Sequence, residues 1–171
     1  VIKELKDCGK DVFMISGDKE AKAKAAAAKL GIEPGKVVYE VKPADKADII
    51  NALKSEGRTV AMVGDGINDS PALVCADIGI AMGTGTDIAI DAADVMIAGG
   101  NISGIPLVFR VSEGTVRNIR QNLTWAVIYN VICIPLAAAG IVNPSIAAAA
   151  MALSSNGVLL NSLRIRKLER K

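Results

Sequence analysis

A stretch of the chain without any charged residue sets the first constraint on its fold. It runs from Gln121 to Leu163, 43 of the 171 residues. A helix needs about 20 apolar residues to cross the hydrocarbon core of a bilayer, because each residue adds about 1.5 Å. The run is therefore long enough for two spans and a turn. Asn143 and Pro144 interrupt a helix and Ser145 can cap the next one, so they mark the turn.

We expect a hairpin of two transmembrane helices at 123–142 and 145–163. Two buried core helices of a soluble protein are the alternative, but two uncharged helices of spanning length rarely lie inside so small a domain. Basic side chains flank only the outer ends of the hairpin: they are Arg117, Arg120, Arg164, Arg166, Lys167, Arg170 and Lys171. The positive-inside rule then predicts a multi-pass membrane protein in contact with lipid, with both ends of the hairpin and the soluble part in the cytoplasm.

The remaining composition excludes several classes of protein. Residues 1–120 carry 15 of the 20 Lys and Arg and 17 of the 18 Asp and Glu. The net charge of +2 and the aromatic content of 3% argue against a nucleic-acid partner. Cys8, Cys75 and Cys133 are far apart and the chain has no histidine, so neither a disulfide framework nor a zinc site is expected.

Short strands and helices alternate along residues 1–100. Apolar runs predict strands at 11–16, 36–41, 59–63, 78–82 and 94–98, with helices at 1–10, 19–30, 43–56 and 70–76 between them. This order predicts an α/β fold with a doubly wound parallel sheet and helices on both faces. An amphipathic linking helix at 101–122, the hairpin at 123–163 and a basic tail at 164–171 complete the expected organisation.

Polar residues gather where the predicted strands end. Such sheets bind ligands beyond the carboxyl ends of their strands, so we expect these residues to converge. Asp65 and Asp69 provide the hard oxygen ligands that Mg²⁺ takes when it also holds a phosphate, and a lysine would balance the phosphate charge. The whole set is Ser16, Gly17, Asp18, Lys46, Asp65 and Asp69.

Each of these patterns also has a purely structural interpretation. Asp-Gly and Asn-Asp pairs mark turns, Ser16 to Asp18 is typical of a helix cap, and a single lysine is usually a solvated surface group. No residue of the set is an obvious nucleophile.

Longer motifs favour the functional interpretation over the structural one, because they resemble the motifs of a known family. The segment "GDGINDSPAL" at 64–73 resembles the magnesium-binding hinge motif of the P-type ATPases, with Ser70 where alanine is usual. "MISGDK" at 14–19 resembles the family's phosphate-binding segment, and "VKPADK" at 41–46 the segment with its phosphate-contacting lysine. Residues 78–97 follow the family as well. The chain therefore resembles the carboxyl-terminal part of a P-type ATPase, whose phosphorylation domain has a haloacid-dehalogenase-like fold.

The resemblance implies a role for each residue of the set and two cofactors for the intact parent, Mg²⁺ and ATP. Asp65 and Asp69 would hold Mg²⁺, and Asn68 would support the metal and the phosphate. The remaining implied catalytic residues are Ser16 and Gly17, which would hold the phosphoryl oxygens, together with Asp18 and the phosphate-contacting Lys46.

The hairpin resembles that of the heavy-metal branch that transports copper(I) or silver. Tyr129 and Asn130 of the first span and Met151 and Ser155 of the second would contact the ion. A thioether suits a soft monovalent ion, and the hairpin has no carboxylate for zinc, calcium or protons. Packing and hydrogen bonding between the helices is the alternative role of these side chains, and packing is expected for Cys133. A copper chaperone is an implied partner.

Several motifs of the family are not found in this sequence. They are "DKTGT" with its phosphate-accepting aspartate, the nucleotide-binding domain, the actuator motif "TGE" and the membrane Cys-Pro-Cys. We therefore expect a fragment of an ion pump that is inactive alone and that works with these missing parts. A free-standing phosphatase of the haloacid dehalogenase type and a non-enzymatic membrane subunit or regulator are the alternatives.

Overall fold

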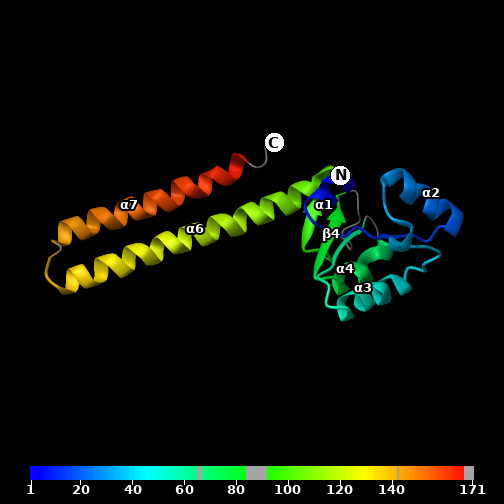
Figure 1. Cartoon of the computed structure of the whole chain (residues 1–171), viewed down its shortest axis with the longest axis horizontal. Helices are drawn as coiled ribbons and strands as arrows, with labels where there is room; N and C mark the ends of the chain where they lie inside the picture. The colour runs from blue at the N-terminus through cyan, green and yellow to red at the C-terminus, as the bar shows by residue number, and fades with distance from the viewer. Residues whose placement is uncertain (65–66, 84–91, 142, 168–171) are drawn as a thin grey trace. The chain divides into compact units, whose positions relative to one another are not determined.

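A computed structural model of the chain describes residues 1–64, 67–83, 92–141 and 143–167 (Figure 1). The chain divides into two compact units, Val1–Pro106 and Leu107–Lys171. The described strands all belong to the first unit, and the second unit consists of helices. The α/β part and the helical part expected from the sequence are therefore separate structural units.

Short helices and strands alternate along the first unit. The strands are β1 (Met14–Ile15), β2 (Val37–Val38), β3 (Ala61–Gly64), β4 (Ile78–Met82) and β5 (Val95–Ile97). The α-helices are α1 (Ile2–Asp7), α2 (Glu20–Leu30), α3 (Asp45–Ser55) and α4 (Ser70–Cys75). Three 3-10 turns accompany them: η1 (Pro34–Lys36), η2 (Ile67–Asp69) and η3 (Ala98–Gly100).

Every pair of strands in the described residues is parallel. This pairing, with described helices between β1 and β2, β2 and β3, and β3 and β4, confirms the expected parallel α/β class. The sheet is divided, however. β1 pairs with β2, while β3, β4 and β5 form a second sheet in that order, and no ladder joins β1 to β3 in the described part of the chain.

Two clusters of buried side chains hold the first unit together. The first joins α2 to β2 and consists of Ala23, Ala27, Ile32 and Val37. The second joins α3, β3 and α4 and consists of Ile50, Met62, Ala72 and Leu73. Ile15 of β1 packs against the second cluster. The carboxyl end of β1 therefore lies beside α3 and β3 although no ladder connects the two sheets.

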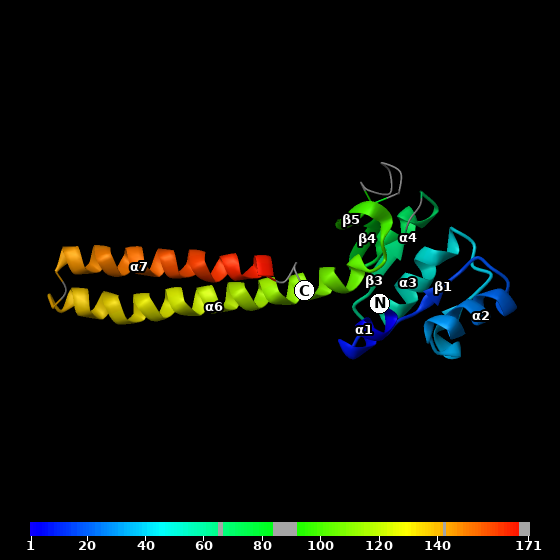
Figure 2. The same ribbon diagram turned by 90° about the horizontal axis from the view of Figure 1, so that it is seen from above.

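The second unit is formed largely by two long helices that lie side by side (Figures 1 and 2). α6 runs from Gly104 to Ala138, and α7 runs from Pro144 to Leu163. Gly140, with a φ of 71°, lies between them, and the side chain of Asn143 caps α7 by accepting the Ser145 N–H at 3.1 Å. A last 3-10 turn, η4 (Arg164–Lys167), follows α7.

α6 differs from the sequence prediction in two ways. The expected linking helix and the first expected span are one continuous helix, because residues 118–124 contain no glycine or proline that would end it. The helix also ends at Ala138, before the predicted end at Val142. Pro135 lies inside α6, in its last turn.

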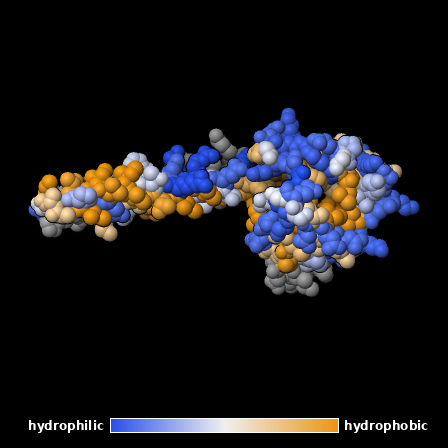
Figure 3. Space-filling model, turned by 60° about the horizontal axis from the view of Figure 1, so that its bottom comes forward, coloured by the Kyte–Doolittle hydropathy of each residue, from blue (hydrophilic) through white to orange (hydrophobic). Residues whose placement is uncertain are grey.

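The surface of the second unit is apolar for most of its length. α6 is long and apolar enough to cross a membrane. Leu123, Ile132, Leu153 and Leu160 are each more than half exposed on the two helices. Figure 3 shows this hydrophobic surface over much of the α6–α7 pair, with hydrophilic side chains along one part of it. Exposed leucine and isoleucine over this length are typical of a lipid-facing surface.

Candidate functional site

An ion pair between Lys46 and Asp69 is the centre of the candidate site. Lys46 lies in the first turn of α3, and Asp69 ends η2 just before α4. The Lys46 Nζ is 2.5 Å from the Asp69 Oδ1, and the two side chains are only 17% and 12% exposed. The structure thus joins two of the residues that the sequence analysis placed at one edge of the sheet. Both charges are largely shielded from water, and an ion pair in such a partly buried position interacts more strongly than one at the surface.

Gly64 makes this position of Asp69 possible. A Cβ atom on Gly64 would lie 2.7 Å from the Asp69 Cβ and 3.0 Å from its Oδ2. Any side chain at position 64 would therefore push the carboxylate away from Lys46. The glycine before the predicted metal ligand is needed for close packing at the end of β3.

The loop after β1 is fixed by its own hydrogen bonds. The Ser16 Oγ accepts the Asp18 N–H at 3.1 Å, and the Asp18 Oδ1 accepts a hydrogen bond from Lys22 at 2.7 Å. Backbone bonds tie the loop to the segment after β2: Val41 N–H donates to the Ser16 carbonyl, and Glu40 N–H to the Asp18 carbonyl. The loop is therefore a rigid turn beside the second cluster, which Ile15 contacts.

Gly17 has little room around it. A Cβ atom there would lie 3.3 Å from the Val41 carbonyl oxygen. The backbone of Gly17 thus approaches the segment after β2 closely. Such an arrangement suits a backbone that contacts an anion.

The metal ligands proposed from the sequence are described only in part. Asp65 lies outside the described residues, and Asn68 is exposed in η2. The Asp69 Oδ1 accepts a hydrogen bond from the Lys46 Nζ, and no described residue donates to its Oδ2. A carboxylate oxygen without a donor among the described residues is compatible with Mg²⁺, which takes one or two carboxylates and keeps several waters. The described residues contain no group of three His, Cys, Asp or Glu that could hold a metal by themselves.

Ser70, which the sequence analysis noted only as a departure from the usual alanine, has an unexpected environment. Its Oγ is buried and has no hydrogen-bond partner among the described residues. The atom follows directly after Asp69, at the start of α4. Pro71, which has no N–H, is next, so no backbone donor of that residue is available for it.

Asp77 is a structural acid close to the same elements. Its Oδ2 accepts the Val60 N–H at 2.8 Å, and its Oδ1 lies 3.0 Å from the Lys54 Nζ. The hydrogen bond from Val60, followed by Lys54, lowers the pKa of the Asp77 carboxyl below its ordinary value. The ionised form of Asp77 therefore ties the end of α4 to α3 and to the start of β3.

The residues predicted to contact the transported ion lie on both helices of the second unit. Tyr129 and Asn130 belong to α6, and Met151 and Ser155 belong to α7. Met151 is 75% exposed and Tyr129 37%. The Ser155 Oγ donates to the Met151 carbonyl of its own helix at 3.0 Å. The described hairpin therefore leaves these side chains open to further contacts and does not bring the four into one closed site.

A cluster of amide side chains, which the sequence analysis did not single out, joins α6 to α7. Asn122 Nδ2 donates to the Asn118 Oδ1 at 2.9 Å and to the Ser162 Oγ at 3.1 Å. Asn161 Nδ2 donates to the Asn122 Oδ1 at 2.9 Å and to the Gln121 Oε1 at 3.3 Å. Asn118 Nδ2 donates to the Asn161 carbonyl at 2.7 Å. Asparagines at 118 and 122, four positions apart, were the only local signal of such a cluster.

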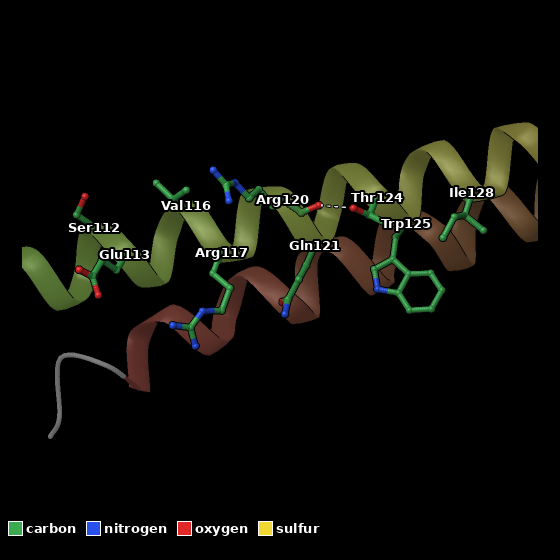
Figure 4. Close-up of a pocket in the computed structure, with 9 residues that line it drawn as sticks. All are labelled: Ser112, Glu113, Val116, Arg117, Arg120, Gln121, Thr124, Trp125 and Ile128. Carbon is green, nitrogen blue, oxygen red and sulfur yellow. Dashed lines mark hydrogen bonds between the residues drawn. The ribbon is translucent and has the colours of Figure 1, made fainter. Parts of the chain in front are cut away.

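A groove of about 700 Å³ lies along the charged part of α6 (Figure 4). Arg117, Gln121 and Trp125 point towards α7, while Val116 and Arg120 point away from it. Arginines followed by a tryptophan are the order expected where a helix enters a membrane. The groove contains none of the predicted ion contacts. Its lining is Ser112, Glu113, Val116, Arg117, Arg120, Gln121, Thr124, Trp125 and Ile128.

Comparisons with known proteins agree with this geometry. Residues 1–77 match the haloacid dehalogenase-like hydrolase family. A copper-exporting P-type ATPase of Staphylococcus epidermidis is 52% identical over 168 residues, which are 98% of this chain and 21% of that protein. The chain thus spans about a fifth of the length of such relatives.

Solved structures show the same likeness in three dimensions. A zinc-transporting PIB-type ATPase in the E2.Pi state aligns with a TM-score of 0.84 at 35% identity, over 96% of this chain and 26% of that one. The catalytic domain of the CPx-ATPase CopB-B aligns with a TM-score of 0.57 at 37% identity, over 62% of this chain and 43% of that one. The first alignment includes the hairpin, and together they confirm the expected haloacid-dehalogenase-like fold.

Proposed function

The chain belongs to the heavy-metal branch of the P-type ATPases, and we propose that it is the part of a copper(I) pump that holds phosphate and magnesium and supplies two ion-pathway helices. The observation that carries the proposal is the 52% identity over 98% of the chain to a copper-exporting pump. The partly buried Lys46–Asp69 pair supports it, because it joins two residues of separate motifs at one edge of the sheet.

In this proposal Lys46 and the loop after β1 bind the phosphoryl group. The Lys46 ammonium offsets negative charge on the phosphate, and Asp69 holds that ammonium in place. Ser16 and Gly17 contribute a hydroxyl and a backbone N–H from a turn that is already rigid, so little ordering is needed when the phosphate arrives. Asp18 fixes the turn through Lys22.

Asp65 and the Oδ2 of Asp69 are the proposed magnesium ligands, with Asn68 next to Asp69 in the chain. Mg²⁺, when bound, would neutralise charge on the phosphate oxygens. The rest of the arrangement depends on the protein: Gly64 keeps the Asp69 carboxylate close to the end of β3. Asp65→Asn in the full-length pump should therefore abolish most phosphorylation by ATP, whereas Asn68→Ala should have a smaller effect.

The phosphate-accepting aspartate is proposed to come from a part of the pump outside this chain. The sequence contains no "DKTGT" motif. In the described residues β1 pairs only with β2 and β3 pairs only with β4, so each strand has one edge without a partner. Ile15 keeps β1 near the elements around β3. A parallel strand that carries the aspartate could pair with both edges, and this chain alone would then be unable to hydrolyse ATP.

The two long helices are proposed to cross the membrane with both outer ends in the cytoplasm. α6 is apolar enough to span, and α7 carries no charged residue between Pro144 and Leu163. The charged flanks, Arg117, Arg120 and Arg164 among them, lie only at the outer ends of the pair.

Copper(I), or silver, is the proposed cargo. Met151 offers a soft thioether, and Tyr129, Asn130 and Ser155 are neutral oxygen donors. A divalent hard ion would need carboxylates, and the sequence has none between Gln121 and Leu163. Partners for the pump are then membrane lipid, its own nucleotide-binding and actuator parts, and a copper chaperone.

The test is the ion dependence of the ATPase activity of the full-length pump. Copper(I) or silver should stimulate it more than zinc does. Met151→Ala should weaken this stimulation and leave phosphorylation from inorganic phosphate intact, because that reaction needs only the phosphate site. Leu153→Ala is the matched control, since Leu153 is similarly exposed on α7 and has no soft donor. Equal stimulation by zinc would reject the proposed cargo.

A further inference from the structure

The amide cluster between α6 and α7 occupies the outer end of the helix pair. Its members are Asn118, Gln121, Asn122, Asn161 and Ser162. Asn118 is buried, with 7% of its surface exposed, and is one of the few buried polar residues in the described chain. Asn122 and Asn161 each use both of their amide hydrogens within the cluster. A polar cluster in which the members satisfy one another holds its helices in one relative position, since any slip leaves donors without acceptors.

The contacts also involve the backbone at the end of α7. The Asn161 carbonyl lies in the last turn of the helix, where carbonyl groups have no partner four residues further on. It accepts the Asn118 Nδ2 at 2.7 Å as well as the N–H of Arg164. A side chain of α6 therefore caps the carboxyl end of α7. This contact ties the backbone of one helix to the other and fixes their relative height.

That height determines which residues of the two helices lie at the same depth. Ser162 donates to the Asn118 Oδ1, so these two residues define a level. Tyr129 lies eleven residues after Asn118, and Met151 lies eleven residues before Ser162. Because the helices are antiparallel, equal steps of about 1.5 Å per residue bring Tyr129 and Met151 to one depth, about 16 Å from the cluster.

We propose that the amide cluster is a register lock that keeps Tyr129 and Asn130 of α6 at the same depth as Met151 of α7. The proposal rests on the proposed function for the identity of the ion, but the lock itself does not. A slip of one residue would move Met151 by about 1.5 Å and turn it by about 100° relative to Tyr129, enough to separate ligands of one ion. Asn118, Asn122, Asn161 and Ser162 are positioning residues, because they lie about 10 to 16 Å along the helices from Tyr129 and Met151.

The first experiment measures the register in the chain itself. Spin labels replace Leu123 and Leu159, which are exposed on α6 and α7, after the native cysteines are changed to serine, and the chain is placed in lipid nanodiscs. The double variant Asn122→Leu with Asn161→Leu should shift or broaden the distance distribution by about 1.5 Å or more. The control is Thr124→Val, which removes a hydrogen bond of 2.8 Å to Arg120 within the same helix and should change nothing. An unchanged distribution of spin-label distances in the double variant would contradict the proposed register lock.

The second experiment measures its effect in the full-length pump. The double variant should raise the copper(I) concentration for half-maximal ATPase stimulation about three- to tenfold, the scale of one or two interhelical hydrogen bonds. Phosphorylation from inorganic phosphate should stay unchanged. The exchange of Asn122→Ser with Ser162→Asn keeps a donor and an acceptor across the helices, and it should restore much of the affinity. An unchanged half-saturation, or the loss of phosphorylation from phosphate, overturns the positioning role. If copper does not stimulate the wild type, the proposed function fails, and the spin-label distances alone decide the lock.

Discussion

The Lys46–Asp69 pair allows a quantitative prediction for the first unit. Lys46→Met should lower the local stability of α3 and α4 by about 3 kcal/mol, the lower end of the cost of removing one partner from a buried ion pair. The lower end applies because the side chains keep 17% and 12% exposure, so water partly solvates the remaining carboxylate. Asp69→Asn should cost less, because its amide still fits beside Gly64 and a lysine can extend its ammonium into water.

The measurement is amide hydrogen exchange of the full chain in detergent, followed by mass spectrometry of peptides from α3 and α4. The double variant of Lys46→Met and Asp69→Asn tests whether the two side chains are energetically coupled. Its destabilisation should be smaller than the sum of the two single destabilisations by about 1 kcal/mol or more. Lys54→Met is the matched control on the same helix. Its pair with Asp77 is about one-third exposed on both sides, so solvent screens it and Lys54→Met should destabilise the helix much less than Lys46→Met. Additive effects of Lys46→Met and Asp69→Asn would refute the reasoning.

Three further outcomes follow from particular contacts. The pKa of the Asp77 carboxyl is lowered in the folded chain, so its stabilising contribution is present at neutral pH and is lost as the pH falls below the ordinary value of 3.8. The difference in melting temperature between Asp77→Asn and wild type should therefore shrink over that range. Gly64→Ala should destabilise the first unit by about 1–3 kcal/mol in thermal unfolding and reduce phosphorylation of the full-length pump, since the new methyl group overlaps Asp69. A cysteine at position 143, in a background without native thiols, should react with an impermeant reagent only from the outside; reaction only from the cytoplasmic face would contradict the hairpin topology.

The sequence was most informative where the physics is local. The charge-free run predicted the two long helices, and the alternation of short apolar runs with helices predicted the parallel strands, because burial and periodicity act over a few residues. Lys46 and Asp69 were both expected at one edge of the sheet. Their direct pairing was not predicted, because the side chain of Lys46 could equally reach a ligand or water.

Other features depend on contacts that are distant in the chain. Asn118 and Asn161 are 43 residues apart, so only the folded hairpin shows that they meet. The continuity of α6 was missed because a change in composition near Gln121 resembles a boundary, although no residue there ends a helix. The division of the sheet also could not be foreseen, since apolar strands do not specify their neighbours.

Pro135 gives the two ends of the α6–α7 pair different mechanical properties. A proline has no N–H, so the carbonyl of Val131, four residues earlier, receives no helical hydrogen bond. The last turn of α6 therefore bends at less cost than the rest of the helix. Asn118 and Asn122 tether the opposite end to α7. The pair is therefore held together at the end with the amide cluster and bends more easily at the end with Pro135, and such bending leaves the relative depth of Tyr129 and Met151 unchanged.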